Sequence, residues 1–150
     1  MTNHLVKIFE RIMKEFLQSH LETLQYLSDF QHGFRKNRSC LSQLLKFNNS
    51  ILEYLENGIN VDLIYLDLAK AFNRVDFGVL AHRLKAVSVK GKFALWIMSF
   101  LMGRKQSIMA NDVLSEESDV LSGVPQGTIL GPILFLIVIE TLLDLELEKL

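Results

Sequence analysis

One run of twelve residues, 61–72, constrains the fold of this 150-residue chain more than any other stretch. It is apolar, rich in β-branched and aromatic side chains, and preceded by the turn-like residues 57–60. This pattern predicts a strand that is buried on both faces and ends at Asp67. A carboxylate at the end of a buried strand is costly to keep charged unless a cation or hydrogen-bond donors meet it there. Asp67 is therefore either a metal ligand or a cap for the next helix.

Five segments have apolar residues at intervals of three or four positions, which predicts amphipathic or buried helices. They are residues 1–20, 41–55, a stretch that runs from Phe77 through Leu84, 92–102 and 131–149. Residues suited to capping flank them: Thr2 or Asn3, Ser39 and Asp76 before the first three, and Asn57–Gly58 and Gly103 after the second and fourth. Residues 107–110 and 119–121, joined by a turn at Asn111–Asp112, predict a hairpin. We therefore expect an α+β fold.

Composition limits the class of protein. With 49% hydrophobic residues the chain has enough apolar mass for the core of one ordinary domain. Cys40 is the single cysteine, so no disulfide framework exists and an intracellular protein, in cytoplasm or nucleus, is expected. The N-terminus lacks the uninterrupted apolar segment of a secretory signal, and the longest apolar run, 129–139, is shorter than the roughly 20 residues of a membrane helix. We expect neither secretion nor a membrane.

Two polar loops and one tryptophan have competing interpretations. Residues 28–39 combine Gly33 with cations at Arg35, Lys36 and Arg38, so this segment is either a solvated loop or a phosphate-binding loop. Residues 122–127, with two glycines and a proline around Gln126, form either an ordinary strand-to-helix connection or a close approach to a ligand. Trp96 shares a helical stripe with other apolar residues, which favours a core position over a base-stacking platform.

Three blocks of sequence resemble, in the right order, the reverse transcriptases of non-LTR (LINE-like) retrotransposons. They are residues 31–39, the segment from Asp67 through Phe72 to Asp76, and residues 122–132. The resemblance covers nearly the whole chain, and the last block is the most specific of the three. It implies a partial right-hand polymerase, with fingers-like helices and a basic loop in residues 1–58 and an incomplete palm in residues 59–150. The chain is expected to be truncated at both ends relative to that family.

The resemblance also implies a chemistry and a set of site residues. The family is an RNA-directed DNA polymerase that uses an RNA template, a DNA primer, deoxynucleotides and two Mg²⁺ ions for nucleotidyl transfer. By this resemblance Asp67 is the catalytic carboxylate and, with the backbone carbonyl of Leu68, a metal ligand. The implied nucleotide-binding residues are Leu68, Phe72 beneath the sugar, and Gln126 and Gly127. The implied phosphate or template contacts are Arg35, Lys36 and Arg38.

The chain departs from the family pattern in ways that affect activity. Asn73 stands where relatives commonly carry a second acid, and no Asp–Asp pair occurs anywhere in the 150 residues. Asp76 is expected to cap a helix rather than to bind metal. Two functions therefore stay open: a reverse transcriptase fragment that is inactive alone, and a non-catalytic remnant that binds nucleic acid or a protein partner weakly.

The net charge of −1 is not that of a strong nucleic-acid binder. We also expect an exposed apolar palm surface, centred on the first half of the 131–149 helix, that allows self-association.

Overall fold

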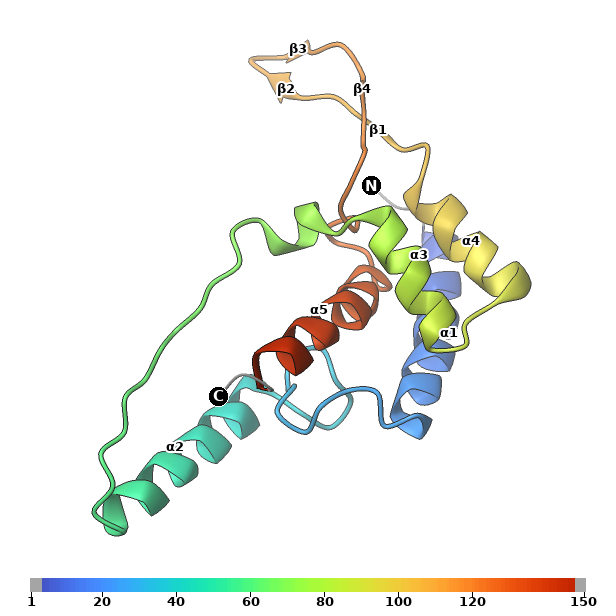
Figure 1. Ribbon diagram of the computed structural model, residues 1–150. Helices are drawn as coiled ribbons and strands as arrows, with labels where there is room; N and C mark the ends of the chain where they lie inside the picture. The colour runs from blue at the N-terminus through green and yellow to red at the C-terminus, as the bar shows by residue number, and fades with distance from the viewer. Residues whose placement is uncertain (1–3, 148–150) are drawn as a thin grey trace. The chain divides into compact units, whose positions relative to one another are not determined.

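A computed structural model describes residues 4–147, with side chains described as far as residue 140 (Figure 1). Its elements in chain order are α1 (His4–Thr23), α2 (Cys40–Glu56), the 3₁₀ helix η1 (Ala71–Arg74), α3 (Phe77–Ala86), α4 (Gly91–Leu101), β1 (Lys105–Gln106), β2 (Met109–Ala110), β3 (Val113–Leu114), β4 (Ser118–Asp119) and α5 (Gly131–Leu147). The chain forms two compact units. The larger comprises residues 4–26 and 70–147, and the smaller is Leu27–Ala69.

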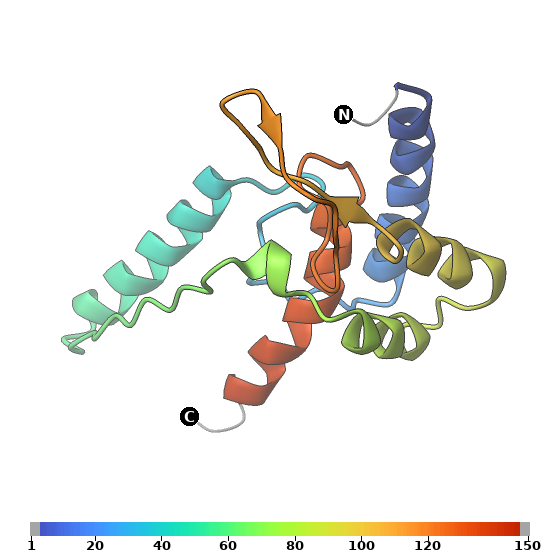
Figure 2. The same ribbon diagram turned by 90° about the horizontal axis from the view of Figure 1, so that it is seen from above.

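The core of the larger unit is built around α5. This helix packs against α1, α3 and η1, while α3 also packs against α4 (Figures 1 and 2). The fully buried apolar side chains come from all four long helices of the unit and from the residue before α5: Leu17, Leu21, Leu80, Leu84, Ile97, Leu101, Leu130, Ile133, Leu134, Leu136 and Ile137. Each contributes about 1.5–3 kcal/mol by leaving water. The expectation that the first half of the 131–149 helix lies uncovered is therefore wrong, because α1 and α3 cover it.

Local capping signals produced the predicted helix ends. The side chain of Ser39 accepts a hydrogen bond from the amide of Ser42, whose own side chain accepts one from the amide of Ser39. Asp76 accepts one from the amide of Val79 at 2.8 Å and begins α3, as predicted. Gly103 follows the end of α4 with a positive φ, which confirms the predicted helix stop. The predicted caps Thr2 and Asn3 lie outside the described residues.

Helix α1 forms where the sequence predicts it, but most of its apolar residues toward the N-terminal end are exposed. Leu5, Ile12 and Phe16 are 72%, 57% and 62% exposed, whereas Glu10 is fully buried. Trp96 packs edge-on against Phe9, with ring centroids 4.9 Å apart, so it contacts other apolar residues as predicted, but it is half-buried rather than part of the core. The helix packs into the core through Leu17 and Leu21 near its C-terminal end, and the apolar side chains nearer its N-terminus are largely exposed to solvent.

A two-stranded ribbon joins α4 to the loop before α5 and extends away from the helices of its unit (Figure 1). Strand β1 pairs antiparallel with β4, and β2 with β3. Asn111 and Asp112 both have positive φ, at 49° and 60°, as a tight hairpin turn demands. The predicted hairpin turn is confirmed, but the strand predicted at 119–121 is mostly wrong, because Met109–Ala110 pairs with Val113–Leu114 and only Asp119 of that stretch lies in a strand.

The smaller unit contains α2 and the segment that carries Asp67. The prediction of a strand buried on both faces is wrong: residues 59–68 have no regular secondary structure, and residues 62–70 are exposed. Tyr65 instead lies against Phe47 of α2, with ring centroids 6.4 Å apart. A buried strand requires neighbouring strands to pair its amides and carbonyls, and Leu27–Ala69 contains no other strand.

Within the described residues, no helix is both long and apolar enough to cross a membrane.

Candidate functional site

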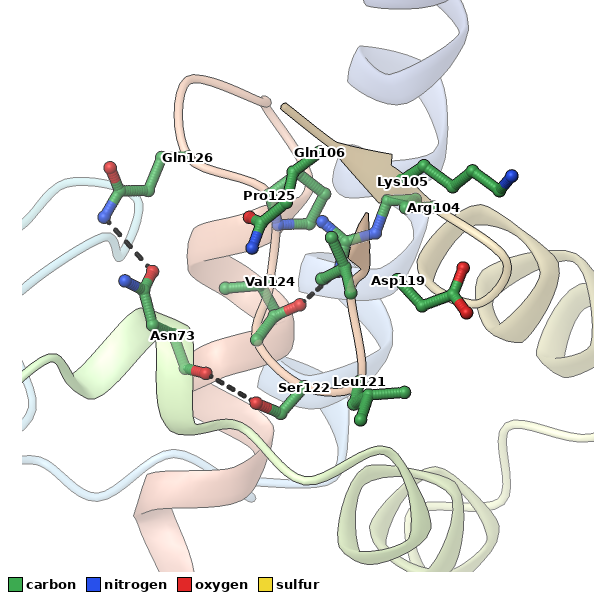
Figure 3. A pocket seen from close by; sticks show the side chains of 12 residues that line it. Asn73, Arg104, Lys105, Gln106, Asp119, Leu121, Ser122, Val124, Pro125 and Gln126 are labelled. Atoms are coloured by element: carbon green, nitrogen blue, oxygen red, sulfur yellow. Dashed lines mark hydrogen bonds between the residues drawn. The ribbon is translucent and has the colours of Figure 1, made fainter. Parts of the chain in front are cut away.

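Two of the three sequence blocks meet in the larger unit, where η1 and the residue after it contact the start of the 122–130 loop. The amide of Gly123 donates to the carbonyl of Val75 at 2.8 Å, and the amide of Val124 donates to the carbonyl of Phe72 at 2.9 Å. The hydroxyl of Ser122 donates to the carbonyl of Asn73 at 2.9 Å (Figure 3). Segments about fifty residues apart in sequence are thus joined by three hydrogen bonds to main-chain acceptors.

Gly123 is the residue at the centre of this junction. Its φ is +90°, and a Cβ atom added there would lie 2.8 Å from both the Cα and the carbonyl oxygen of Asn73. Real Cβ atoms do not approach backbone that closely, and residues with a side chain rarely adopt this φ. Both the conformation of the loop and its approach to η1 therefore require glycine at this position.

The side chains of the junction separate into an apolar and a polar side. Phe72 is half-buried and stacks on Phe135 of α5, with ring centroids 4.7 Å apart. On the polar side, Gln126 Nε2 donates to Asn73 Oδ1 at 3.4 Å, and both side chains are exposed (Figure 3). The structure thus brings together the segments that carry Phe72 and Gln126, two of the predicted nucleotide-binding residues, while the Phe72 ring itself packs on α5.

The tip of the loop is open. Gly127 has a φ of +76°, and an added Cβ would meet no atom within 4 Å. The hydroxyl of Thr128 turns the chain by donating to the carbonyl of Pro125 at 2.7 Å and accepting from the amide of Gly131 at 3.2 Å. Gln126 and Gly127 are therefore presented at an exposed tip between two well-anchored ends.

An open groove of about 920 Å³ runs along the loop (Figure 3). Its walls are Asn73, residues 104–106 and residues 119–126. Lys105 lies at its edge and forms an exposed ion pair with Glu117 at 3.3 Å. The groove combines amide, cationic and carboxylate groups with apolar residues such as Leu121 and Val124.

Two charged residues outside the three blocks fix the ends of the loop. The Arg104 guanidinium donates to the carbonyl of Leu101 at 2.7 Å through Nε and to the carbonyl of Gly123 through Nη2. Partial burial lowers the pKa of Arg104 below its usual range. At the other end, Glu10 Oε2 accepts from the amides of Ile129 and Leu130 at 2.7 and 3.2 Å. Sequence reasoning missed both residues, because nothing in their local pattern distinguishes them from other helix-end cations and helix carboxylates.

In the smaller unit, the basic residues of the 28–39 segment are engaged unequally. Arg35 donates to the carbonyl of Ser28 at 2.6 Å, and Arg38 forms an ion pair with Asp29 at 2.6 Å. The hydrogen bond and the charge of Arg38 lower the pKa of Asp29. Lys36 is exposed. Two of the three predicted phosphate contacts thus also hold their own loop together.

His32 is the buried residue of this segment. It is 8% exposed, with Nδ1 at 2.7 Å from the hydroxyl of Ser42 and Nε2 at 3.4 Å from the Arg38 guanidinium. Burial lowers the pKa of His32, and the nearby positive charge of Arg38 lowers it further. A neutral imidazole between a hydroxyl and a guanidinium stabilises the turn that leads into α2.

Asp67 and Leu68, the predicted metal ligands, lie exposed in the segment between α2 and η1. Mg²⁺ sites of polymerases need several carboxylates. Among the described residues, no group of three or more His, Cys, Asp or Glu side chains is arranged to hold a metal ion. The donor set therefore does not fit a two-metal centre, although Asp67 is free to contribute one carboxylate to a site completed by other residues.

Comparison with known proteins gives one family over almost the entire chain. The model of the family described as "Reverse transcriptase (RNA-dependent DNA polymerase)" matches residues 1–149. The chain is 31% identical over 129 residues to "Probable RNA-directed DNA polymerase from transposon X-element" of Drosophila melanogaster. It is 35% identical over 129 residues to "RNA-directed DNA polymerase from mobile element jockey" of Drosophila funebris. Each match covers 86% of this chain and 14% of the relative, so the chain spans about one seventh of the length of these proteins.

Proposed function

The chain belongs to the reverse transcriptase (RNA-dependent DNA polymerase) family, of the non-LTR retrotransposon kind, and from this premise we propose that it is the segment of an RNA-directed DNA polymerase that positions the incoming deoxynucleotide. The proposed site consists of the loop tip at Gln126 and Gly127, together with Phe72 at the junction. The partners would be a deoxynucleoside triphosphate, an RNA template and a DNA primer. In the terms of a right-hand polymerase, residues 1–58 would be fingers and residues 59–150 part of the palm.

One observation supports this proposal above the others: the tight junction between η1 and the start of the 122–130 loop. The loop is bonded to the carbonyls of Phe72, Asn73 and Val75, and a glycine is needed for the approach. An ordinary strand-to-helix connection needs neither the close approach nor the three long-range bonds. The exposed tip has the polar amide of Gln126 and the open space at Gly127 that a nucleotide stacking close to backbone would require.

The proposed roles of Asp67 and of the basic loop rest on the family resemblance. Asp67 would be the one catalytic carboxylate and Mg²⁺ ligand in this segment, with the carbonyl of Leu68 beside it. Arg35, Lys36 and Arg38 would contact phosphates of template or nucleotide, with exposed Lys36 as the strongest candidate. The remaining carboxylates of a two-metal site would have to come from residues other than those described, since one carboxylate does not hold two divalent ions.

A binding measurement tests the proposal directly. The 150-residue chain should bind Mg²⁺–dATP, and changing Gln126 to Ala should weaken that binding, as followed by isothermal titration calorimetry. Leu121→Ala serves as the control, because Leu121 lines the same groove and is 83% exposed. Equal loss of affinity in both variants, or no binding by the unmodified chain, would refute the nucleotide role. A chain that binds single-stranded RNA but no nucleotide would match the alternative of a non-catalytic remnant.

A further inference from the structure

Two charged side chains from outside the recognised sequence blocks hold the two ends of the 122–130 loop. We propose that Arg104 and Glu10 are positioning residues for this loop, and that together they fix how Gln126 and Gly127 are presented to a nucleotide. This inference rests on the proposed function for its nucleotide, and on the geometry of the loop for its positioning role. Both residues lie in the same compact unit as the loop.

Arg104 anchors the start of the loop. Its guanidinium bridges the last turn of α4, at the carbonyl of Leu101, and the carbonyl of Gly123. The guanidinium carbon also lies 5.9 Å from the ring centroid of Phe77 on α3. A planar group with several donors can meet these two acceptors together, whereas an ammonium group is a single point charge. Arg104 therefore ties the loop to α3 and α4 at the same residue whose amide is bonded to Val75.

Glu10 anchors the end of the loop. It is fully buried on α1, and its Oε2 atom accepts two successive amides, those of Ile129 and Leu130, directly before α5. A carboxylate near a helix N-terminus is favoured both by the free amides and by the helix dipole. The other oxygen of Glu10, Oε1, is buried and has no hydrogen-bond partner among the residues that the structure describes. Burying a charged carboxylate costs free energy. We therefore explain the buried Glu10 by its hydrogen bonds to the amides of Ile129 and Leu130, which hold the end of the loop, rather than by packing.

The arrangement leaves the middle of the loop as its free part. Between the Arg104 and Glu10 anchors, Gln126 and Gly127 are exposed, and the Thr128 hydroxyl closes the turn beneath them. With both ends fixed, the tip has little freedom other than its own turn. Loss of either anchor should loosen the tip while Gln126 and Gly127, the proposed nucleotide contacts, stay in the chain.

Amide hydrogen exchange tests the anchors one at a time. In Arg104→Met, which keeps the length of the side chain and removes its donors, exchange at the amides of Gly123 and Val124 should accelerate about tenfold, while α3 exchanges as in the unmodified chain. The matched control is Lys92→Met, because Lys92 is an exposed cation on α4 that does not line the groove. It should leave the exchange of the loop unchanged.

The second anchor has its own pair of variants. Glu10→Gln keeps the shape of the side chain and removes its charge, and it should accelerate exchange at Ile129 and Leu130 about tenfold. Glu15→Gln is the control, because Glu15 is exposed on the same helix. Equal acceleration in all helices of the unit would overturn the proposal, because it would mean that Arg104 and Glu10 only support global stability. Unchanged exchange at the loop would overturn it as well.

Binding of Mg²⁺–dATP connects the anchors to function. Both anchor variants should weaken binding about tenfold, in line with their loosened loops, and neither control should. Loosened loops with unchanged nucleotide affinity would overturn the positioning role. If the unmodified chain binds no Mg²⁺–dATP, the proposed function fails, and with it the claim that the anchors serve a nucleotide. The exchange data would then decide separately whether they order the loop.

Discussion

The junction at Gly123 allows a quantitative test, because the chain offers a matched glycine at Gly127. Both residues have positive φ, +90° and +76°, so a change to alanine imposes similar backbone strain of about 1–2 kcal/mol at each. Only at Gly123 does the new Cβ meet other atoms, at 2.8 Å from the Asn73 backbone. That separation is well inside the roughly 3.5–4.0 Å at which carbon atoms attract one another.

The clash in Gly123→Ala can be relieved only if the loop moves away from η1. Such a movement lengthens three hydrogen bonds, from Ser122, Gly123 and Val124 to the carbonyls of residues 72–75. At about 0.5–1.5 kcal/mol each, these bonds add to the strain, and the smaller entropy of the unfolded alanine chain offsets part of the sum. We expect Gly123→Ala to lower the free energy of unfolding by about 3 kcal/mol and Gly127→Ala by about 1 kcal/mol.

Urea unfolding measures this difference. Trp96 is the single tryptophan and packs between α1 and α4, so its fluorescence reports the unfolding of the larger unit, and circular dichroism gives a second probe. Two-state analysis requires that the transitions by the two probes coincide. If the two alanine variants unfold within about 0.5 kcal/mol of each other, the close approach to Asn73 does not exist in solution, and the reasoning on the junction is refuted.

Three further outcomes are expected. Asp76→Ala should lower the free energy of unfolding by about 1 kcal/mol, because it removes the acceptor of the Val79 amide in the first turn of α3, and Asp76→Asn should keep most of that stability in the same urea assay. Replacing Arg35 and Lys36 with alanine should flatten the salt dependence of single-stranded RNA binding, measured by fluorescence anisotropy, and an unchanged slope would identify a merely solvated loop. With primed RNA template, deoxynucleotides and Mg²⁺, the 150-residue chain should extend no primer above background, because within the part of the chain that the structure describes no second carboxylate joins Asp67 in a metal-binding group. Extension that disappears in Asp67→Asn would contradict this.

Local chemistry explains which elements the sequence predicts well. Ser39 and Asp76 cap helices through amides three residues away, and the Asn111–Asp112 turn depends on its own two residues. These signals need no distant partner, so they hold in almost any fold that contains the segment. The helices and the hairpin turn were predictable for this reason.

The strand at residues 61–67 illustrates the opposite case. Its apolar, β-branched sequence describes a segment able to be buried on both faces, but burial and pairing depend on other strands. Leu27–Ala69 contains no strand to pair with it, so the same residues lie exposed, with Ile64 86% accessible. The apolar pattern shows that residues 61–67 could form a buried strand, but whether they do depends on other strands that can pair with them.

The site shows the same division between local and tertiary information. Gln126 and Phe72 were predicted through the family resemblance, and the junction brings their segments together. Arg104 and Glu10 were not predicted, because an arginine after a helix and a glutamate within one are common, and their meaning depends on contacts 19 and 119 residues away. On α1 the sequence pattern predicts that apolar residues are buried, yet Glu10 is fully buried while Leu5, Ile12 and Phe16 are exposed.

The junction also gives a physical account of Asn73, the position where the family resemblance predicts an acid. Two of its neighbours, Phe72 and Val75, accept the loop amides through main-chain carbonyls, and Asn73 accepts the Ser122 hydroxyl in the same way. Its side chain adds only Oδ1, an acceptor for Gln126 Nε2, and a carboxylate would offer the same oxygen. Because the connection between the two segments depends on backbone atoms and on Gly123, the exchange of acid for amide leaves it intact. What the exchange removes is a negative charge beside Gln126, so its cost would fall on cation binding rather than on the architecture of the loop.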